Sequence, residues 1–353
     1  MDFHKTLLNW YLLNSRSLPW RETSNPYNIW LSEIMLQQTR IAQGLPYYEK
    51  FIAHFPTVFD LANAKEEHVL KLWQGLGYYS RARNLHFTAK YVAEELNGIF
   101  PDNYKDLKKL KGVGDYTAAA IASICYDEPV AVVDGNVYRV LARYFGVETP
   151  INSTEGVKQF KALAQEMLYK KDPKHYNQAL MEFGALHCKP KNPLCESCPF
   201  QKNCVAFQQG KTASLPVKLK KTKVTTRHFN YLVFKKNDET LLQKRTGKGI
   251  WKNLYEFPLL ETSEEIQKEA FTNHPEVEKL VGKNFKNIRL YNNKPIKHVL
   301  SHQKLFAKFW IISVEDFPVA FEKPIIATQF STIETFAVPV LLEKFIEAFH
   351  FSK

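Results

Sequence analysis

Two acidic residues occur in sequence surroundings where carboxylates are uncommon. Glu33 lies inside the densely apolar run Ile29–Thr39, where burial should raise the pKa of its carboxyl and keep it protonated. Asp134 follows the apolar run Pro129–Val133 and directly precedes a predicted helix, so it should stay ionised beside that helix N-terminus and Asn136. A carboxyl that keeps its proton and another that loses it can divide the work of acid catalysis and charge stabilisation.

A Gly-Val-Gly turn lies between two predicted helices, and we interpret residues 106–122 as a helix-hairpin-helix. Gly112 and Gly114 have no side chains, so their backbone amides can approach an anion such as phosphate near the second helix N-terminus. Together with Asp134, this turn indicates chemistry on the sugar or backbone of a nucleic acid. Each short motif also has a simpler interpretation, because Gly-x-Gly is often only a turn and Asp before a helix is often only an N-cap.

Four of the five cysteines gather near the middle of the chain with the spacing C-x6-C-x2-C-x5-C. They are Cys188, Cys195, Cys198 and Cys204. Four thiolates this close in sequence can surround one metal centre. Structural zinc more often uses two Cys-x2-Cys pairs, so the single pair here favours an iron–sulfur cluster, although spacing alone leaves both metals open. Cys125 lies in an apolar helix and is expected to be an ordinary core residue.

The composition limits the class of protein. The chain has 353 residues, 45% of them hydrophobic, and a net charge of +12, which predicts two folded domains and a basic surface suited to a polyanion. No apolar run is long enough to span a membrane, and the polar N-terminus does not resemble a secretory signal. The few, clustered cysteines do not suit a disulfide scaffold. We therefore expect a cytoplasmic protein that binds no membrane. A monomer is a separate expectation.

The pattern of apolar residues divides the chain into a helical part and a mixed part. Residues 1–207 predict a helical domain, with helices near 3–12, 29–39, 47–55, 68–73, 81–96, 117–126, 137–145, 157–168 and 176–185. Residues 208–227 predict a basic linker that either lies on phosphates or is merely solvated. Residues 228–353 predict a smaller α+β domain, with strands near 231–234, 239–243 and 306–312 and helices at 263–271 and near the C-terminus.

Taken together, these motifs resemble the endonuclease III superfamily of base-excision repair glycosylases. The hairpin, the run Val133–Val137 (V-D-G-N-V) and the cysteine spacing carry this resemblance. Within the superfamily, Leu18–Arg21, Ser32–Arg40 and Gly75–Leu85 are similar to the MutY-type adenine DNA glycosylases. The resemblance covers essentially the whole chain. It implies a mainly α helix-hairpin-helix domain with a [4Fe-4S] cluster loop at 188–204, followed by a smaller α+β Nudix-like domain.

The resemblance also implies a reaction, namely excision of adenine mispaired with 8-oxoguanine or guanine in double-stranded DNA of a bacterial cell. Glu33 would protonate N7 of the flipped adenine, and Asp134 would stabilise the positively charged sugar. Tyr116 and Asn136 would support these two carboxyls. Bifunctional relatives carry a lysine where this chain has Tyr116, so we expect no Schiff base and a monofunctional glycosylase.

Matching to the family assigns further residues to the DNA. The residues that would line the adenine pocket are Arg16, Trp20, Arg21, Leu36 and Gln178, and those beside the opposite base would be Gln38, Thr39, Leu76 and Tyr78. Trp20 and Leu36 could instead be ordinary core residues, because large apolar side chains usually pack in cores.

The C-terminal domain resembles the Nudix-like module that this family uses to recognise 8-oxoguanine. Gly249–Pro258 looks like the run that precedes a Nudix helix, but Glu264-Glu265 alone does not complete the carboxylate set that holds Mg²⁺ in a Nudix hydrolase. The family's reader is a Phe-Ser-His loop, and this chain has Leu300 before Ser301 and His302. The polar contacts to the modified base are therefore kept, whereas the aromatic ring is not. The simpler interpretation of this loop is a hairpin turn.

Three alternative functions compete with this interpretation. The first is an endonuclease III-like glycosylase and lyase for damaged pyrimidines, which Tyr116 disfavours. The second is a nucleotide-pool hydrolase, which the incomplete carboxylate set of the C-terminal domain disfavours. The third is a DNA-binding module without catalysis, which the presence of both Glu33 and Asp134 disfavours.

Overall fold

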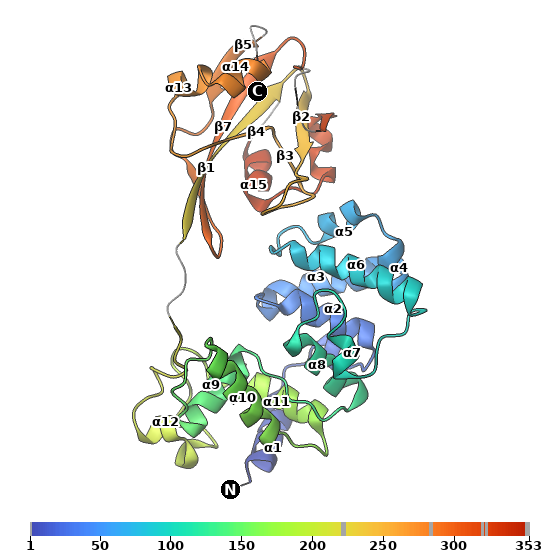
Figure 1. Ribbon diagram of the computed structural model, residues 1–353, viewed down its shortest axis with the longest axis vertical. Coiled ribbons are helices and arrows are strands. Elements are labelled where there is room, and N and C mark those ends of the chain that lie inside the picture. Colours follow the sequence, from blue (N-terminus) through green and yellow to red (C-terminus); the bar gives the residue numbers. More distant parts are fainter. Residues whose placement is uncertain (1, 220–223, 282–284, 319–320, 322–323, 350–353) are drawn as a thin grey trace. The chain divides into compact units, whose positions relative to one another are not determined.

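The structure is a computed structural model that describes residues 2–219, 224–281, 285–318, 321 and 324–349 (Figure 1). Residues 220–223 of the predicted linker and residues 350–353 at the predicted end of the C-terminal domain lie outside the described residues. The chain forms two compact units. One contains residues 1–63 and 84–220, and the other contains residues 64–83 and 221–353. Residues 64–83, which the sequence places in the helical domain, therefore group with the second unit.

The first unit is helical, as predicted. Its elements are α1 (Phe3–Asn14), η1 (Pro19–Arg21), α2 (Pro26–Leu36), α3 (Ile41–His54), α4 (Val58–Asn63), most of α6 (Ser80–Glu95), α7 (Tyr104–Leu107), α8 (Asp115–Tyr126), α9 (Gly135–Phe145), α10 (Thr154–Glu166), α11 (Pro173–Leu186), η2 (Gln201–Asn203) and α12 (Val205–Gln208). The predicted helices of this unit are present with shifted ends, and the short α4 is an addition.

Helix α2, which carries Glu33, begins and ends earlier than predicted. The Asn25 side chain caps its N-terminus by accepting a hydrogen bond of 2.9 Å from the backbone N–H of Tyr27, and Pro26 occupies the first helical position. The helix ends at Leu36, because Gln38 has a φ of 57°, which an α-helix does not accommodate. The end of the predicted helix, including Gln38 and Thr39, is therefore a loop.

The helix-hairpin-helix is present, but its first helix is earlier and shorter than the apolar spacing predicted. Helix α7 ends at Leu107, and residues 108–114 form turns in which Leu110 and Val113 are still buried. Spacing of three residues fits consecutive turns as well as a helix, because both return side chains to the same side. Gly112 has a φ of +84°, and a Cβ built on it would lie 2.8 Å from the Cβ of Asn84. This position therefore requires glycine.

The core of the helical unit holds α9 tightly against α11. Leu141 of α9, Phe160 of α10 and Leu180 of α11 are buried in one apolar cluster, and these helices lie together with α1 in Figure 1. A Cβ at Gly184 of α11 would lie 2.6 Å from the Cβ of Asn136, so a glycine is needed for this close approach. Helix α9 ends at Gly146, as predicted, in the left-handed conformation that is typical of C-caps.

The first half of the predicted linker is attached to the helical unit. The side chain of Leu215 is buried, and its carbonyl accepts a hydrogen bond of 3.1 Å from Nε of Arg143. The carbonyl of Val217 accepts one of 3.0 Å from the backbone N–H of Ile151. Asn152 bonds both backbone groups of Leu219. Residues 215–219 are thus part of the folded unit.

The second unit contains two sheets and several short helices. Its elements are α5 (Glu66–Leu72), β1 (Thr225–Lys235), β2 (Glu239–Lys244), β3 (Tyr255–Glu256), β4 (Leu259–Thr262), α13 (Lys268–Thr272), α14 (Pro275–Val281), β5 (Phe285–Leu290), β6 (Ile296–Val299), β7 (Gln303–Val314), β8 (Ile325–Gln329), η3 (Phe330–Thr335) and α15 (Val340–Ala348). One sheet has the order β4-β1-β7-β5 with β6 also pairing β7, and the other has the order β3-β2-β8. The α+β prediction is confirmed, although β1 already begins inside the predicted linker.

Helices cover both faces of the larger sheet. Successive side chains of a strand point to opposite faces, and β7 shows this alternation clearly. Phe309 stacks on Phe345 of α15 with 3.9 Å between ring centroids, whereas the next residue, Trp310, stacks on Phe271 of α13 at 4.0 Å. Figure 1 shows α13 and α14 away from α15 across the long strands β1 and β7.

The predicted helix at 263–271 is only α13 (Lys268–Thr272), so Glu264 and Glu265 lie in the loop that precedes it. Glu265 instead forms an ion pair of 2.8 Å with Lys308, whose side chain is almost fully buried. An unpaired buried ammonium is unfavourable, and this pairing explains why Glu265 points to the sheet. The two glutamates therefore do not form the Mg²⁺-binding face of a Nudix helix.

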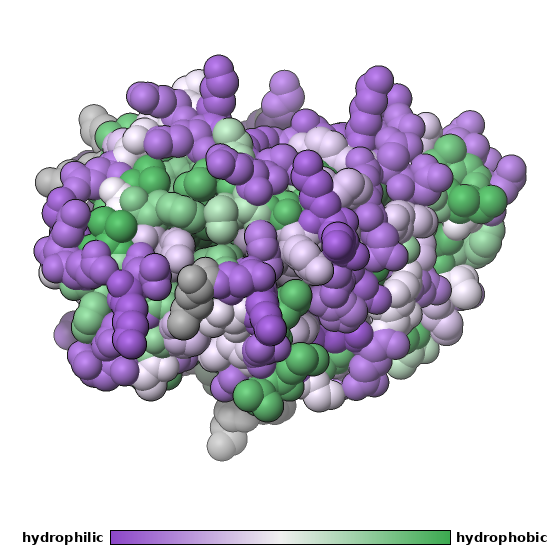
Figure 2. All heavy atoms as spheres, turned by 90° about the horizontal axis from the view of Figure 1, so that it is seen from below, coloured by the Kyte–Doolittle hydropathy of each residue, from purple (hydrophilic) through white to green (hydrophobic). Residues whose placement is uncertain are grey.

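Among the described residues, no helix combines the length and the apolar composition that crossing a bilayer requires. Figure 2 shows one face on which hydrophilic side chains predominate and apolar side chains form separate patches.

Replacing Gly112 by Ala should lower the free energy of unfolding by about 1–3 kcal/mol, since the left-handed backbone and the contact with Asn84 both oppose a side chain. Gly114 is the matched control. Its φ of −91° is available to every residue, and nothing lies within 4 Å of a Cβ placed there. Gly114→Ala should therefore change stability by less than about 0.5 kcal/mol. Equal losses for both variants in urea titrations would contradict this account of the hairpin.

Candidate active site

A cavity of about 550 Å³ in the helical unit contains the carboxyls predicted to act together. Glu33 from α2, Tyr116 from α8, and Asp134 and Asn136 at the start of α9 all line it. The predicted adenine-pocket residues Arg16, Trp20, Arg21, Leu36 and Gln178 line the same cavity, and so does Thr39. The fold thus brings together residues that are far apart in the sequence, and both carboxyls open into one space.

The Glu33 carboxyl is held in an environment that favours its neutral form. It is almost fully buried, and its Oε2 atom has no hydrogen-bond partner among the described residues. Burial raises the pKa of Glu33 to about 7; the nearby Asp134 carboxyl also raises this pKa, while Tyr116 and Arg21 lower it. A carboxylic acid with this pKa can carry a proton at neutral pH and donate it.

Asp134 is partly buried and is surrounded by hydrogen-bond donors. Its Oδ1 accepts from the backbone N–H groups of Asn136 at 2.9 Å and Val137 at 2.8 Å, and its Oδ2 accepts from Nδ2 of Asn136 at 2.7 Å. Burial raises the pKa of Asp134, whereas these hydrogen bonds and the nearby Arg139 oppose that rise. Asp134 is therefore both an N-cap of α9 and a lining residue of the cavity, so the two interpretations of this residue are compatible.

Tyr116 interacts electrostatically with both carboxyls. Its hydroxyl is 3.7 Å from the sulfur of Met181, and burial, followed by Glu33 and Asp134, raises its pKa well above the ordinary value. The side chain therefore stays neutral and can only exchange hydrogen bonds with the acids.

Two residues that the sequence did not single out organise this site. The Glu182 carboxylate of α11 accepts hydrogen bonds from both Arg16 and Arg21. Arg139 of α9 donates from Nη2 to Oδ1 of Asn136 at 2.8 Å and from Nε to the carbonyl of Cys188 at 2.7 Å. The available signal was a charged residue on the apolar side of a helix, the same kind of signal that identified Glu33.

The remaining pocket residues combine packing with exposure to the cavity. Trp20 is buried and packs edge-on against Tyr48, with 5.0 Å between ring centroids, yet it also lines the cavity. Leu36 is partly buried and packs against Gly44 of α3. Gln178 accepts a hydrogen bond of 2.9 Å from the Tyr11 hydroxyl. Trp20 and Leu36 thus pack against neighbouring residues, as core residues do, and they also line the cavity.

The residues predicted beside the opposite base are divided between the two units. Gln38 is exposed and follows α2 in the helical unit, whereas Leu76 is buried and Tyr78 is half exposed in the second unit. Gln38 and Tyr78 both have positive φ angles, 57° and 48°, which is uncommon for residues other than glycine. Such backbone conformations concentrate at functional sites.

Ser301 and His302 occupy the turn between β6 and β7, so the hairpin interpretation is correct as far as it goes. They also line a cavity of about 700 Å³ within the second unit, together with Tyr78, Arg83 and Trp251. The Tyr78 hydroxyl forms a short hydrogen bond with Oγ of Ser301. Ser301 and His302 thus contribute polar side chains to a cavity that is large enough for a base.

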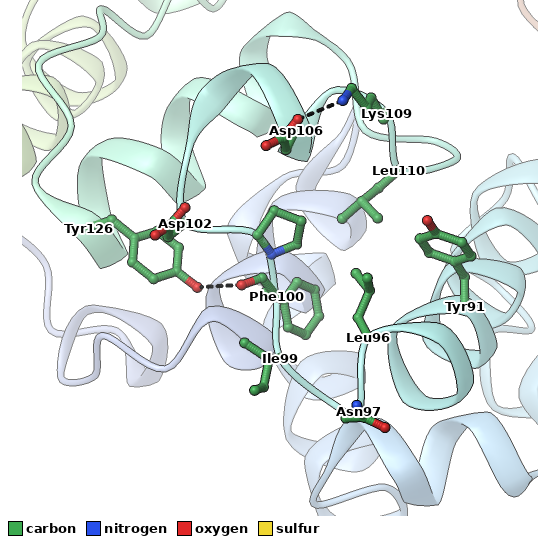
Figure 3. Close-up of a pocket in the computed structure, with 11 residues that line it drawn as sticks. Tyr91, Leu96, Asn97, Ile99, Phe100, Asp102, Asp106, Lys109, Leu110 and Tyr126 are labelled. Carbon is green, nitrogen blue, oxygen red and sulfur yellow. Dashed lines mark hydrogen bonds and ion pairs between the residues drawn. The ribbon is translucent and has the colours of Figure 1, made fainter.

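Volume alone does not locate the active site. A cavity of about 720 Å³ lies elsewhere in the helical unit and is lined mainly by apolar side chains such as Leu96, Phe100 and Leu110 (Figure 3). Three of its polar side chains bind within its own wall, because Asp106 pairs with Lys109 at 2.7 Å and the Tyr126 hydroxyl donates to the carbonyl of Phe100 at 3.3 Å. This cavity contains none of the predicted site residues.

The four clustered cysteines lie on one loop that packs against α9. None of the four forms a disulfide, and the described residues contain no group of three or more His, Cys, Asp or Glu side chains arranged around a metal ion. The loop nevertheless offers suitable donors. After burial, the proximity of Cys188 raises the pKa of Cys195, Cys198 and Cys204, so the sulfurs lie within electrostatic reach of one another. Arg143 donates to Sγ of Cys188 at 3.4 Å and would favour a negatively charged cluster.

Comparison with known proteins identifies the family. Residues 31–167 match the "HhH-GPD superfamily base excision DNA repair protein" family, and residues 230–348 match the "NUDIX domain" family. The adenine DNA glycosylase of Buchnera aphidicola subsp. Baizongia pistaciae (strain Bp) is 36% identical over 313 residues, which cover 88% of this chain and 86% of that protein. This chain belongs to the adenine DNA glycosylase family.

Other adenine DNA glycosylases extend the match. That of Buchnera aphidicola subsp. Schizaphis graminum (strain Sg) is 38% identical over 74% of this chain and 75% of its own length. That of Mus musculus is 34% identical over 91% of this chain and 72% of its own length. The chain is accordingly a base-excision repair enzyme that acts on adenine.

Solved structures agree with the fold of the helical unit. A thermostable thymine-DNA glycosylase aligns with a TM-score of 0.55 and 31% identity over 59% of this chain and 95% of that chain. A non-covalent endonuclease III–DNA complex aligns with a TM-score of 0.51 and 22% identity over 58% of this chain and 95% of that chain, and this likeness supports the fold alone.

Replacing Glu33 by Gln should make the protein more stable at pH 8 but not at pH 5. The folded pKa of Glu33, about 7, exceeds the ordinary value of 4.5, so the folded protein holds this proton more tightly than the unfolded chain does. The wild-type protein therefore loses stability progressively as pH rises from about 4.5 to 7. The full difference corresponds to roughly 3 kcal/mol. Urea unfolding of both proteins from pH 5 to 8 measures it, with Glu22→Gln as an exposed control. A gain that does not change with pH would show that Glu33 is not protonated in the folded state.

Proposed function

We propose that this adenine DNA glycosylase removes adenine opposite 8-oxoguanine or guanine in double-stranded DNA by hydrolysis, and that it does so as a monomer in the bacterial cytoplasm. The observation that carries the proposal is the pair of carboxyls in one cavity. Glu33 has an environment that retains a proton, and Asp134 has donors that support an anion. Adenine needs a proton to become a good leaving group, and the sugar becomes positive as the bond breaks.

In the first step, the protonated Glu33 carboxyl gives its proton to N7 of an adenine flipped into the cavity. The electron pair of the glycosidic bond then moves to N9, and adenine departs. The anionic Asp134 stabilises the positive sugar that remains. In the second step, water adds to the sugar carbon and loses a proton to the Glu33 carboxylate, which restores the starting enzyme.

The pocket contacts proposed for adenine come from Arg16, Trp20, Arg21, Leu36 and Gln178. An indole and an aliphatic side chain can pack on the faces of a purine, while guanidinium and amide groups can bond its edge. Asn136 would orient Asp134, and Tyr116 would exchange a hydrogen bond with Glu33.

The enzyme should act without a covalent lyase step. A Schiff base needs a neutral amine at the sugar carbon, but the residues lining the cavity include no lysine. Tyr116, with its high pKa, is a poor nucleophile at neutral pH. A monofunctional hydrolase follows from this residue set, as opposed to a pyrimidine-specific glycosylase and lyase.

The four cysteines are proposed to hold a [4Fe-4S] cluster through their sulfurs. Such a cluster would fix the loop that carries Cys188, Cys195, Cys198 and Cys204 against α9. The basic residues Lys189, Lys191 and Lys202 on the same segment would then face phosphates.

The hairpin is proposed to hold a DNA phosphate with backbone amides near Gly112 and Gly114. The open space around Gly114 and the N-terminus of α8 fit an anion there. Gln38 and Tyr78, with Thr39 and Leu76 nearby in sequence, are proposed to insert into the base stack beside the base opposite the adenine.

Recognition of 8-oxoguanine is assigned to Ser301 and His302. Both line the cavity of the second unit, and both carry hydrogen-bonding groups that a modified base edge can use. The aromatic residue of the family's loop is replaced by Leu300, so the specificity would rest on hydrogen bonds.

Single-turnover assays on duplexes with A:8-oxoG, A:G and thymine glycol test the reaction. Adenine should be released from the first two duplexes, leaving abasic strands that break only on later alkali treatment. Glu33→Gln should lose roughly 10²–10⁴-fold in rate, because the proton donor is removed. The wild-type rate should fall above pH of about 7, where Glu33 loses its proton. Release of thymine glycol but not adenine, or trapping of a covalent complex by borohydride, would reject the proposed function.

Ser301→Ala and His302→Ala should each slow adenine release from A:8-oxoG by roughly tenfold and leave A:G nearly unchanged. Loss of one buried hydrogen bond to a base edge costs about 1–3 kcal/mol, and guanine offers no 8-oxo group to lose. Ser263→Ala, at an exposed position of the same unit, is the control. Parallel losses on both duplexes would indicate a general DNA contact in place of a reader of the modified base.

A further inference from the structure

A buried ion-pair network lies along one wall of the active-site cavity. The side chain of Glu182 on α11 is only 1% exposed. Its Oε1 accepts hydrogen bonds from the backbone N–H and Nε of Arg16 at 3.0 and 2.7 Å and from Nη1 of Arg21 at 3.0 Å. Its Oε2 accepts from Nη2 of Arg16 at 2.5 Å and Nη2 of Arg21 at 2.8 Å. One carboxylate thus receives five hydrogen bonds from two guanidiniums and one amide.

This network fixes the part of the chain that precedes α2. Arg21 also donates from Nη1 to the carbonyl of Arg16 at 2.9 Å, so both arginines are tied to each other as well as to Glu182. Although burial opposes ionisation, the hydrogen bonds from Arg16 and then Arg21 lower the pKa of Glu182 to about 2. At neutral pH, Glu182 is therefore an anion that offsets part of the positive charge of the pocket.

The positive charge of Arg21 acts on Glu33, the proposed proton donor. Glu33 faces Tyr116 of α8, Asp134 at the start of α9, and Arg21 of η1, and Cys125 of α8 is also within electrostatic reach. Asp134 favours the protonated form of Glu33, whereas Arg21 favours the ionised form. Any change that leaves Arg21 without its counter-charge would therefore favour loss of the Glu33 proton.

We propose that Glu182 is a positioning residue for the glycosylase reaction: it holds Arg16 and Arg21 at the rim of the base pocket and offsets part of their positive charge, so that Glu33 keeps its proton. The inference deepens the proposed function and rests on the assignment of Glu33 as the proton donor. Glu182 itself acts through the arginines and transfers no proton.

The test uses Glu182→Gln, which keeps the size of the side chain and removes its charge. Single-turnover adenine release from an A:8-oxoG duplex is measured from pH 5.5 to 9. The high-pH fall of the profile should move down by about one pH unit, because an unpaired cation lowers the pKa of a neighbouring carboxyl by roughly one to three units. At pH 6 the variant should be closer to wild type than at pH 8.

Glu22→Gln is the matched control, since it removes one negative charge from an exposed residue of the same segment. Its profile should coincide with that of wild type. Glu182→Gln combined with Arg21→Gln removes both charges, and its high-pH fall should return toward the wild-type position even if the rate is low. This return separates a charge effect from simple damage to the pocket.

A second readout does not require activity. The loss of stability that Glu33 causes as pH rises from about 4.5 to 7 should end at lower pH and become smaller in Glu182→Gln, because only the folded pKa is lowered. If wild type releases adenine but both the pH profile and this stability profile of Glu182→Gln are unshifted, the inference fails while the proposed function stands. If wild type releases no adenine from any duplex, the proposed function itself fails.

Discussion

The burial of one carboxyl without a full set of hydrogen bonds is the constraint on which the site depends. Moving a charged carboxylate out of water is very unfavourable, so a buried acid either finds compensating donors or keeps its proton. Glu33 does the second, because Oε2 has no partner among the described residues. The apolar helix α2 enforces this choice by surrounding the acid with buried side chains such as Ile29, Trp30 and Ile34.

Three carboxyls line the cavity, and each has different hydrogen-bond partners, which define its role. Glu33 faces little compensation and stays neutral. Asp134 receives two backbone N–H groups and the amide of Asn136, which support an anion without neutralising it. The Glu182 carboxylate is paired with two guanidiniums, so its negative charge is fully compensated and one net positive charge remains on the three groups. An acid, a stabilising anion and a structural counter-ion thus occupy one cavity.

The sequence identified the features that depend on neighbours in the chain and missed those that depend on distant ones. Glu33 and Asp134 were visible because each is anomalous in its own segment. Glu182 has a similar local signal, but its role depends on Arg16 and Arg21, which lie more than 160 residues away, where no spacing rule applies. The predicted end of α2 also differs from the observed one. Gln38 ends this helix through its backbone conformation, which its residue type does not reveal. The two-unit organisation followed from composition, but the grouping of residues 64–83 depends on tertiary contacts alone.

Helix α9 explains why a cysteine loop and a catalytic acid belong to the same unit. Asp134 caps the N-terminus of α9, while Arg139 and Arg143 project from its buried side to the carbonyls of Cys188 and Lys189 at 2.7 and 2.8 Å. Arg139 also bonds Asn136, the residue that orients Asp134. A guanidinium has several donors in one rigid plane, so a shift of the loop must be taken up by α9 or break several bonds together. The cysteine loop therefore supports the helix that positions Asp134, and a well-ordered loop is needed to keep the Asp134 carboxylate in place.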